Sequence, residues 1–95
     1  MASRKLRTFT EQVNEFLRQR QSGAVWEERD YLRGYPSLEQ ETIRKVIRTC
    51  RAIEQTARDL AQQGVDLETL RGMLRQQYPY LEPKRLERVI LLAIC

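Results

Sequence analysis

The fold is decided by residues Leu38 to Gln63, which read LEQETIRKVIRTCRAIEQTARDLAQQ. Apolar side chains recur in this stretch every three or four residues, a spacing that places them on one side of an α-helix. They are Ile43, Val46, Ile47, Cys50, Ile53, Ala57 and Leu60. Ser37 and Gln40 have capping-box spacing before the helix, and Gly64 follows as a typical helix-terminating residue. We therefore predict a long central helix whose apolar side organises the core.

Shorter helical segments are predicted before the central helix. Thr8 and Glu11 have capping-box spacing, and Gly23 marks the end of the first helix. The apolar side of this helix carries Phe9, Val13, Phe16 and Leu17. The less regular stretch near residues 25–33 is expected to form a short helical segment that covers one end of the bundle.

Two more helices are predicted after the central one. Asp66 suits the N-cap of the first. Its apolar positions are Leu67, Leu70, Met73 and Leu74. Gly72 lies inside this helix, where glycine costs about 1 kcal/mol relative to alanine, unless it marks a close contact with a neighbouring helix. Pro79 ends the helix, and Pro83 fits the first turn of the final helix, where its missing N–H is not needed.

The final helix becomes apolar on every side. Its last residues include Val89, Ile90, Leu91, Leu92 and Ile94. A helix that is apolar all round has to be buried all round, and a chain of 95 residues has little else with which to cover it. We therefore expect these five residues to form the interface of a homodimer.

The elements together predict the all-α fold class. No stretch alternates with a period of two, so we expect a small helical bundle of four main helices with one extra short segment. The chain length of 95 residues is usual for one domain. Residues 1–95 are therefore expected to form a single helical domain, in which residues 1–7 are a flexible basic N-terminus.

The charge balance favours an acidic partner. Basic residues outnumber acidic ones by 17 to 13, which gives a net charge of +4. Most of the basic residues are arginine, whose planar fork fits phosphate and carboxylate groups. No apolar run approaches the roughly 18 residues of a membrane span, and no apolar signal-peptide core follows the basic start. We expect an intracellular protein with no membrane partner.

The residues that common enzyme chemistry requires are missing. The chain has no histidine, which is the commonest general base, and no glycine-rich phosphate loop. Its two cysteines, Cys50 and Cys95, cannot supply the four ligands of a usual zinc site. Cys50 lies on the apolar side of the central helix, where a thiol is inert. We predict a non-catalytic protein without a metal or another cofactor.

Arginines line the opposite side of the central helix. They are Arg44, Arg48, Arg51 and Arg58, which we call the arginine stripe. At about 100° and 1.5 Å per residue, the stripe is about 80° wide and about 21 Å long. That length suits contact with a phosphate backbone. Arg18 and Arg20 of the first helix are expected to extend this surface.

The sequence allows two interpretations of the stripe. In one, it holds RNA or DNA mainly by the phosphates, with little sequence preference. In the other, it is the solvated side of an amphipathic helix, neutralised by Glu41, Glu54 and Asp59 of the same helix or by Glu27 and Glu28. Few acids lie within the strip at the positions that would neutralise it, and this favours nucleic-acid binding.

Protein binding is the alternative function. Trp26, Tyr31 and Tyr35 form an aromatic cluster of a kind typical of protein-binding hot spots and base-stacking platforms. Alternatively, Trp26 caps the core. An adaptor or regulator would use this cluster, or the apolar final helix, to bind a protein partner. The preference for arginine over lysine favours nucleic acid as the partner.

Overall fold

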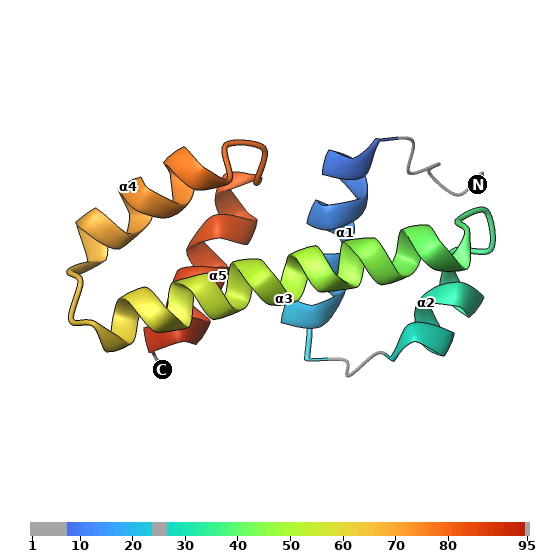
Figure 1. Cartoon of the computed structure of the whole chain (residues 1–95), viewed down its shortest axis with the longest axis horizontal. Helices are drawn as coiled ribbons and strands as arrows, with labels where there is room; N and C mark the ends of the chain where they lie inside the picture. Colours follow the sequence, from blue (N-terminus) through green and yellow to red (C-terminus); the bar gives the residue numbers. More distant parts are fainter. Residues whose placement is uncertain (1–7, 24–26, 95) are drawn as a thin grey trace.

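The computed structural model describes residues 8–23 and 27–94, and helices are the only regular elements within them (Figure 1). They are α1 (Phe9–Gln21), α2 (Glu28–Gly34), α3 (Gln40–Gln62), α4 (Leu67–Gln77) and α5 (Pro83–Ile94). The predicted all-α class is therefore confirmed. The short segment expected near residues 25–33 is a helix in its own right, α2. The expected flexible N-terminus, residues 1–7, lies outside the described residues.

Helix α3 runs along most of the molecule, and the other helices pack on it. Its 23 residues span about 35 Å at 1.5 Å per residue, and the longest dimension of the protein is 41 Å. It contacts each of the other four helices. Figure 1 shows α1 and α2 beside its first half and α4 and α5 beside its second half. The position of α3 therefore sets the positions of the rest.

The core forms where the apolar side of α3 meets the other helices. Five α3 side chains are completely buried, namely Ile43, Val46, Cys50, Ile53 and Ala57. Helix α1 adds Phe16, and α4 adds Leu70 and Leu74, also with no exposed surface. The spacing of apolar residues predicted this side of α3 correctly. At its margins, Ile47 and Leu60 are only partly buried.

Several helix ends follow the local sequence. Thr8 caps α1, where its hydroxyl oxygen accepts a hydrogen bond from the Glu11 backbone N–H at 3.1 Å. Gly23 and Gly64 follow α1 and α3 with φ angles of +93° and +81°, in the left-handed region that glycine adopts without steric cost. The predicted cap by the Thr8 hydroxyl and both glycine ends are therefore confirmed.

The start of α3 differs from the prediction. The N-cap is Glu39, and its side chain makes no capping hydrogen bond. Ser37 lies two residues before this N-cap, so its hydroxyl is not placed to cap the first turn. The predicted capping box of Ser37 and Gln40 is wrong, and α3 depends on its buried side rather than on a polar cap.

Helix α4 buries a narrower side than the sequence predicts. Leu70 and Leu74 are buried, whereas Leu67 is 46% exposed and Met73 is 42% exposed. A Cβ atom added at Gly72 would meet no atom within 4 Å, so this glycine does not serve a close contact between helices. Leu67, Met73 and Gly72 are left uncovered because α4 packs against α3 and α5 only, at one end of the molecule (Figure 1).

Helix α5 is not buried on every side within the chain. Val89 and Ile90 are each 2% exposed and belong to the core, so they are corrected from interface residues to core residues. Leu91, Leu92 and Ile94 are 45%, 48% and 54% exposed, and we call these three the apolar patch of α5. No helix in the described part of the chain combines the length and apolar character needed to cross a membrane.

The packing of α4 can be tested with two neighbouring residues. Leu74→Ala should lower the free energy of unfolding by about 2–5 kcal/mol, because it removes a fully buried side chain and leaves a cavity. Met73→Ala should change it by less than about 1 kcal/mol, since Met73 is substantially exposed. Urea denaturation followed by circular dichroism measures both values. Equal losses would contradict the observed orientation of α4.

Candidate functional site

The arginine stripe lies on the outer side of α3. Arg44, Arg48, Arg51 and Arg58 are all exposed. The opposite side of the helix is held in the core by its buried residues, so the helix cannot rotate to hide the stripe without exposing them. The apolar pattern of α3 therefore fixes the direction in which its arginines point.

Two acids that could neutralise the stripe are held by other residues. The Glu54 carboxylate accepts hydrogen bonds from Arg20 at 2.6 and 2.9 Å. The Asp59 carboxylate accepts a hydrogen bond from the Gln55 amide at 2.8 Å. Neither carboxylate forms an ion pair with a stripe arginine among the described residues. Arg20 thus neutralises Glu54, whereas Asp59 keeps its negative charge but forms no ion pair with a described arginine.

Only one arginine of the stripe has a carboxylate partner in residues 8–23 and 27–94. Arg44 forms an ion pair with Glu28 of α2, and their side chains are 57% and 35% exposed. A pair this exposed contributes about 0–1 kcal/mol. Arg48, Arg51 and Arg58 make no ion pair with the described carboxylates. Three of the four guanidinium groups are thus available to an external anion.

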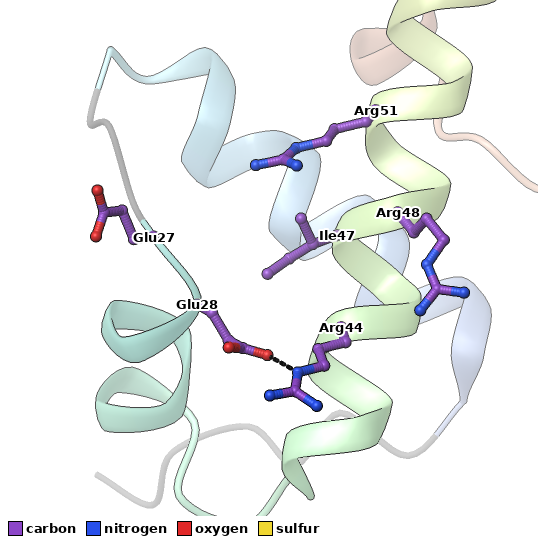
Figure 2. A pocket seen from close by; sticks show the side chains of 6 residues that line it. All are labelled: Glu27, Glu28, Arg44, Ile47, Arg48 and Arg51. Carbon is purple, nitrogen blue, oxygen red and sulfur yellow. Dashed lines mark hydrogen bonds and ion pairs between the residues drawn. The ribbon is translucent and has the colours of Figure 1, made fainter.

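A hollow of about 290 Å³ opens between α2 and α3 beside the stripe (Figure 2). It is lined by Glu27, Glu28, Arg44, Ile47, Arg48 and Arg51. Figure 2 shows Arg44 reaching Glu28. Arg48 and Arg51 are neighbours on the outer side of α3, and in this view their side chains diverge, with Arg51 on the side of Glu27 and Arg48 away from it. Acids line the α2 side and cations the α3 side. An anionic group would therefore be attracted to Arg48 and Arg51 and repelled from the α2 side.

Arg20 does not extend the stripe. Both its Nε and Nη2 atoms donate hydrogen bonds to the Glu54 carboxylate, and the two side chains are 23% and 15% exposed. The hydrogen bond to Glu54 raises the pKa of Arg20. Because the pair joins α1 to α3 and its charges cancel, Arg20 is corrected from a nucleic-acid contact to a structural residue.

Arg18 is also paired, although it is more exposed. Its guanidinium group forms an ion pair with Glu15, one turn earlier on α1. The Glu15 carboxylate accepts a further hydrogen bond from the Tyr35 hydroxyl at 3.0 Å. Burial raises the pKa of Glu15, but the hydrogen bonds from Arg18 and Tyr35 outweigh it and lower the pKa overall. The Glu15 carboxylate therefore offsets part of the positive charge that Arg18 presents to an external anion.

The two described tyrosines of the aromatic cluster do not form a surface patch. Tyr31 is fully buried, and its ring stacks on Phe16 with a centroid distance of 4.2 Å. Tyr35 is partly buried and stacks on the same Phe16 ring at 5.3 Å. Tyr31 is therefore corrected from a partner-binding residue to a core residue, and both tyrosines fasten α2 to α1. Trp26 lies outside the described residues.

Cys50 is a core residue, as its place on the apolar side of α3 predicts. It is fully buried, and burial raises the pKa of its thiol to about 12. The neutral thiol is a poor nucleophile and a poor metal ligand. In residues 8–23 and 27–94, no three histidine, cysteine, aspartate or glutamate side chains lie together as a metal site would require.

One basic cluster was missed by the sequence analysis. A second hollow, of about 380 Å³, lies between the end of α1 and the first turns of α5. Its cationic lining residues are Arg18, Lys84, Arg85 and Arg88. The signal in the sequence is the group of three cations within residues 84–88. It is inconspicuous because Glu82 lies two residues before the group and Glu87 lies within it.

The two classes of arginine should differ in their effect on stability. Arg20→Gln should lower the free energy of unfolding by about 1–3 kcal/mol, because it leaves the largely buried Glu54 carboxylate without its partner. Arg48→Gln should change it by no more than about 0.5 kcal/mol. Urea denaturation at low salt measures both. A stability loss for Arg48→Gln as large as that for Arg20→Gln would mean that Arg48 has a structural role.

Comparison with known proteins gives no match: no protein-family model, no curated protein and no solved structure matches the chain.

Proposed function

We propose that this protein is a non-catalytic nucleic-acid-binding protein that holds the phosphates of RNA or DNA through the arginine stripe of α3. One observation carries the proposal. Arg48, Arg51 and Arg58 are exposed on one helix and have no ion-pair partner among the described residues. Of the acids nearest to them on α3, Glu54 is neutralised by Arg20, and Asp59 is hydrogen-bonded to the neutral Gln55 amide rather than to an arginine.

The geometry of the stripe fits a polyanion better than a single small anion. Arg48 and Arg58 are ten residues apart, which is about 15 Å along the helix axis. One phosphate group cannot reach both, whereas a nucleic-acid backbone presents charges at intervals of a few ångströms over that length. Arginine donates two parallel hydrogen bonds to a phosphate and is always charged. A strand that follows α3 would satisfy the three free arginines together.

Arg44 would join the contact by exchanging partners. Its ion pair with Glu28 is exposed, so it contributes little and competes weakly with a phosphate. Glu27 and Glu28 would then lie at the edge of the bound strand and repel phosphates that approach α2. Contacts of this kind position a nucleic acid without reading its bases. We therefore expect little sequence preference and no requirement for a cofactor. We also propose that the protein is intracellular.

The salt dependence of binding tests this function. Affinity for a labelled 24-base-pair mixed-sequence DNA duplex, measured by fluorescence anisotropy between 50 and 200 mM NaCl, should fall steeply with salt. The double variant R48Q/R51Q should reduce the slope of log affinity against log salt by about 1.8, since each lost phosphate contact removes about 0.9. The same titration with an RNA duplex compares the two nucleic acids.

A charge-matched control separates local contact from net charge. R33Q/R75Q removes two exposed arginines that have no carboxylate partner in the described part of the chain. It should leave the slope almost unchanged. Equal slopes for wild type and R48Q/R51Q, or equal losses for R48Q/R51Q and R33Q/R75Q, would contradict a contact at the stripe.

A second candidate function is protein binding through the apolar patch of α5. Leu91, Leu92 and Ile94 are about half exposed, and water-exposed leucine and isoleucine side chains gain free energy when a partner covers them. The occupant we propose is a second copy of the chain, which would also double the arginine surface. A small chain gains most from such pairing because its own core is small.

The oligomeric state tests the second candidate. The chain should sediment as a dimer at micromolar concentration, and L91S/L92S should shift it to monomer because both substitutions remove apolar area from the patch. M73S, which changes an exposed apolar residue of α4, is the control and should remain dimeric. A wild-type chain that stays monomeric up to 200 µM in sedimentation velocity would remove the dimer from the account.

A further inference from the structure

We propose a second phosphate-binding site, formed by the cluster between the end of α1 and the first turns of α5. The proposal rests on the proposed nucleic-acid function and assigns it a second contact, independent of the arginine stripe. The hollow there, which we call the basic hollow, has a volume of about 380 Å³. It is lined by Arg18, Gln21, Ser22, Lys84, Arg85 and Arg88. Its ligand would be the phosphodiester backbone of the same RNA or DNA.

Among the described residues, three of the four cations that line the basic hollow have no carboxylate partner, and Arg18 is paired with Glu15. None of its lining residues is acidic. Glu87, which lies between the cations in sequence, is held by Arg71 of α4 through hydrogen bonds of 2.5 and 3.2 Å. Lys84 and Arg88 form no ion pair with the described carboxylates and are exposed. The Glu87 carboxylate is thus held toward α4 and does not neutralise Lys84 or Arg88.

The cluster is unfavourable for the helix that carries it. Lys84 and Arg88 are four residues apart on α5, so their like charges lie side by side and repel. Lys84 and Arg85 also lie in the first turn of α5, near the positive end of the helix dipole, where acids are favoured and cations are not. An anion bound in the hollow would relieve both effects.

Arg85 is oriented without losing its charge. Its Nη1 atom donates a hydrogen bond to the Gln21 side-chain oxygen at 2.8 Å, and the Gln21 amide donates one to the Arg85 backbone carbonyl at 3.2 Å. Because Gln21 is neutral, the guanidinium group keeps its full charge and its other N–H donors. This reciprocal contact holds Arg85 in place before a ligand arrives, which reduces the entropy lost on binding.

The basic hollow lies next to one end of the stripe. Gln21, which orients Arg85, also lines a smaller hollow together with Arg58 of the stripe. The end of α1 is therefore flanked by Arg58 on one side and by Arg85 on the other. Glu54 lines the same smaller hollow, but its carboxylate is paired with Arg20. A backbone that follows α3 past Arg58 would meet the basic hollow next.

The experiment compares three double variants that each remove two positive charges. K84Q/R88Q changes the basic hollow, R48Q/R51Q changes the stripe, and R33Q/R75Q is the charge-matched control. Anisotropy titrations with the labelled 24-base-pair duplex give the salt slope of each. K84Q/R88Q should reduce the slope by about 1.8 relative to R33Q/R75Q. K84R/R88K, which keeps both charges, should restore the wild-type slope, and circular dichroism checks that every variant keeps its helices.

The outcomes separate this site from the stripe. If K84Q/R88Q behaves like R33Q/R75Q while R48Q/R51Q loses slope, the basic hollow is overturned and the proposed function stands. If K84Q/R88Q loses slope and R48Q/R51Q does not, binding belongs to the hollow and the stripe is overturned. Displacement of the duplex by a 20-residue polyglutamate at equal charge concentration would overturn nucleic acid as the ligand of both sites, in favour of an acidic protein partner.

Discussion

Burial of one side of α3 is the constraint on which the rest of the structure depends. The side chains that do this, from Ile43 to Ala57, are fully buried, and each contributes on the order of 1–3 kcal/mol when removed from water. All other helices pack on this side or at its margins. Because α3 cannot turn about its axis without exposing those residues, the same burial points Arg48, Arg51 and Arg58 outward. Core and charged surface are therefore two sides of one helix.

The charged residues divide into those that join helices and those that remain free. Arg20 joins α1 to α3 through Glu54, Arg44 joins α3 to α2 through Glu28, and Arg71 joins α4 to α5 through Glu87. Glu54, Glu28 and Glu87 are therefore each paired with one arginine and do not neutralise other cations nearby. Besides Arg33 and Arg75, free cations then lie along α3 and in the basic hollow. A moderate net charge of +4 thus becomes two local basic surfaces, which net charge alone does not reveal.

The sequence predicts well what depends on neighbouring residues and poorly what depends on distant ones. The three-and-four spacing identified the buried side of α3, and Thr8 was recognised as a cap from Glu11 alone. Arg20 and Arg48 look alike in sequence, but Glu54, 34 residues from Arg20, makes one structural and leaves the other free. Tyr31 resembled a surface aromatic because its stacking partner, Phe16, belongs to another helix. The apolar run of α5 similarly could not show which of its residues α3 and α4 would cover.

The most direct test of the account is the NMR spectrum of the arginine Nε–Hε groups during titration with a nucleic-acid duplex. Each guanidinium group gives its own signal, so the phosphate contacts can be assigned residue by residue. The signals of Arg48, Arg51 and Arg58 should shift and saturate together, whereas those of Arg20 and Arg71, already held by Glu54 and Glu87, should stay in place. Shifts of Arg20 and Arg71 with unmoved signals from the α3 arginines would contradict the central claim that the outer side of α3 holds phosphate.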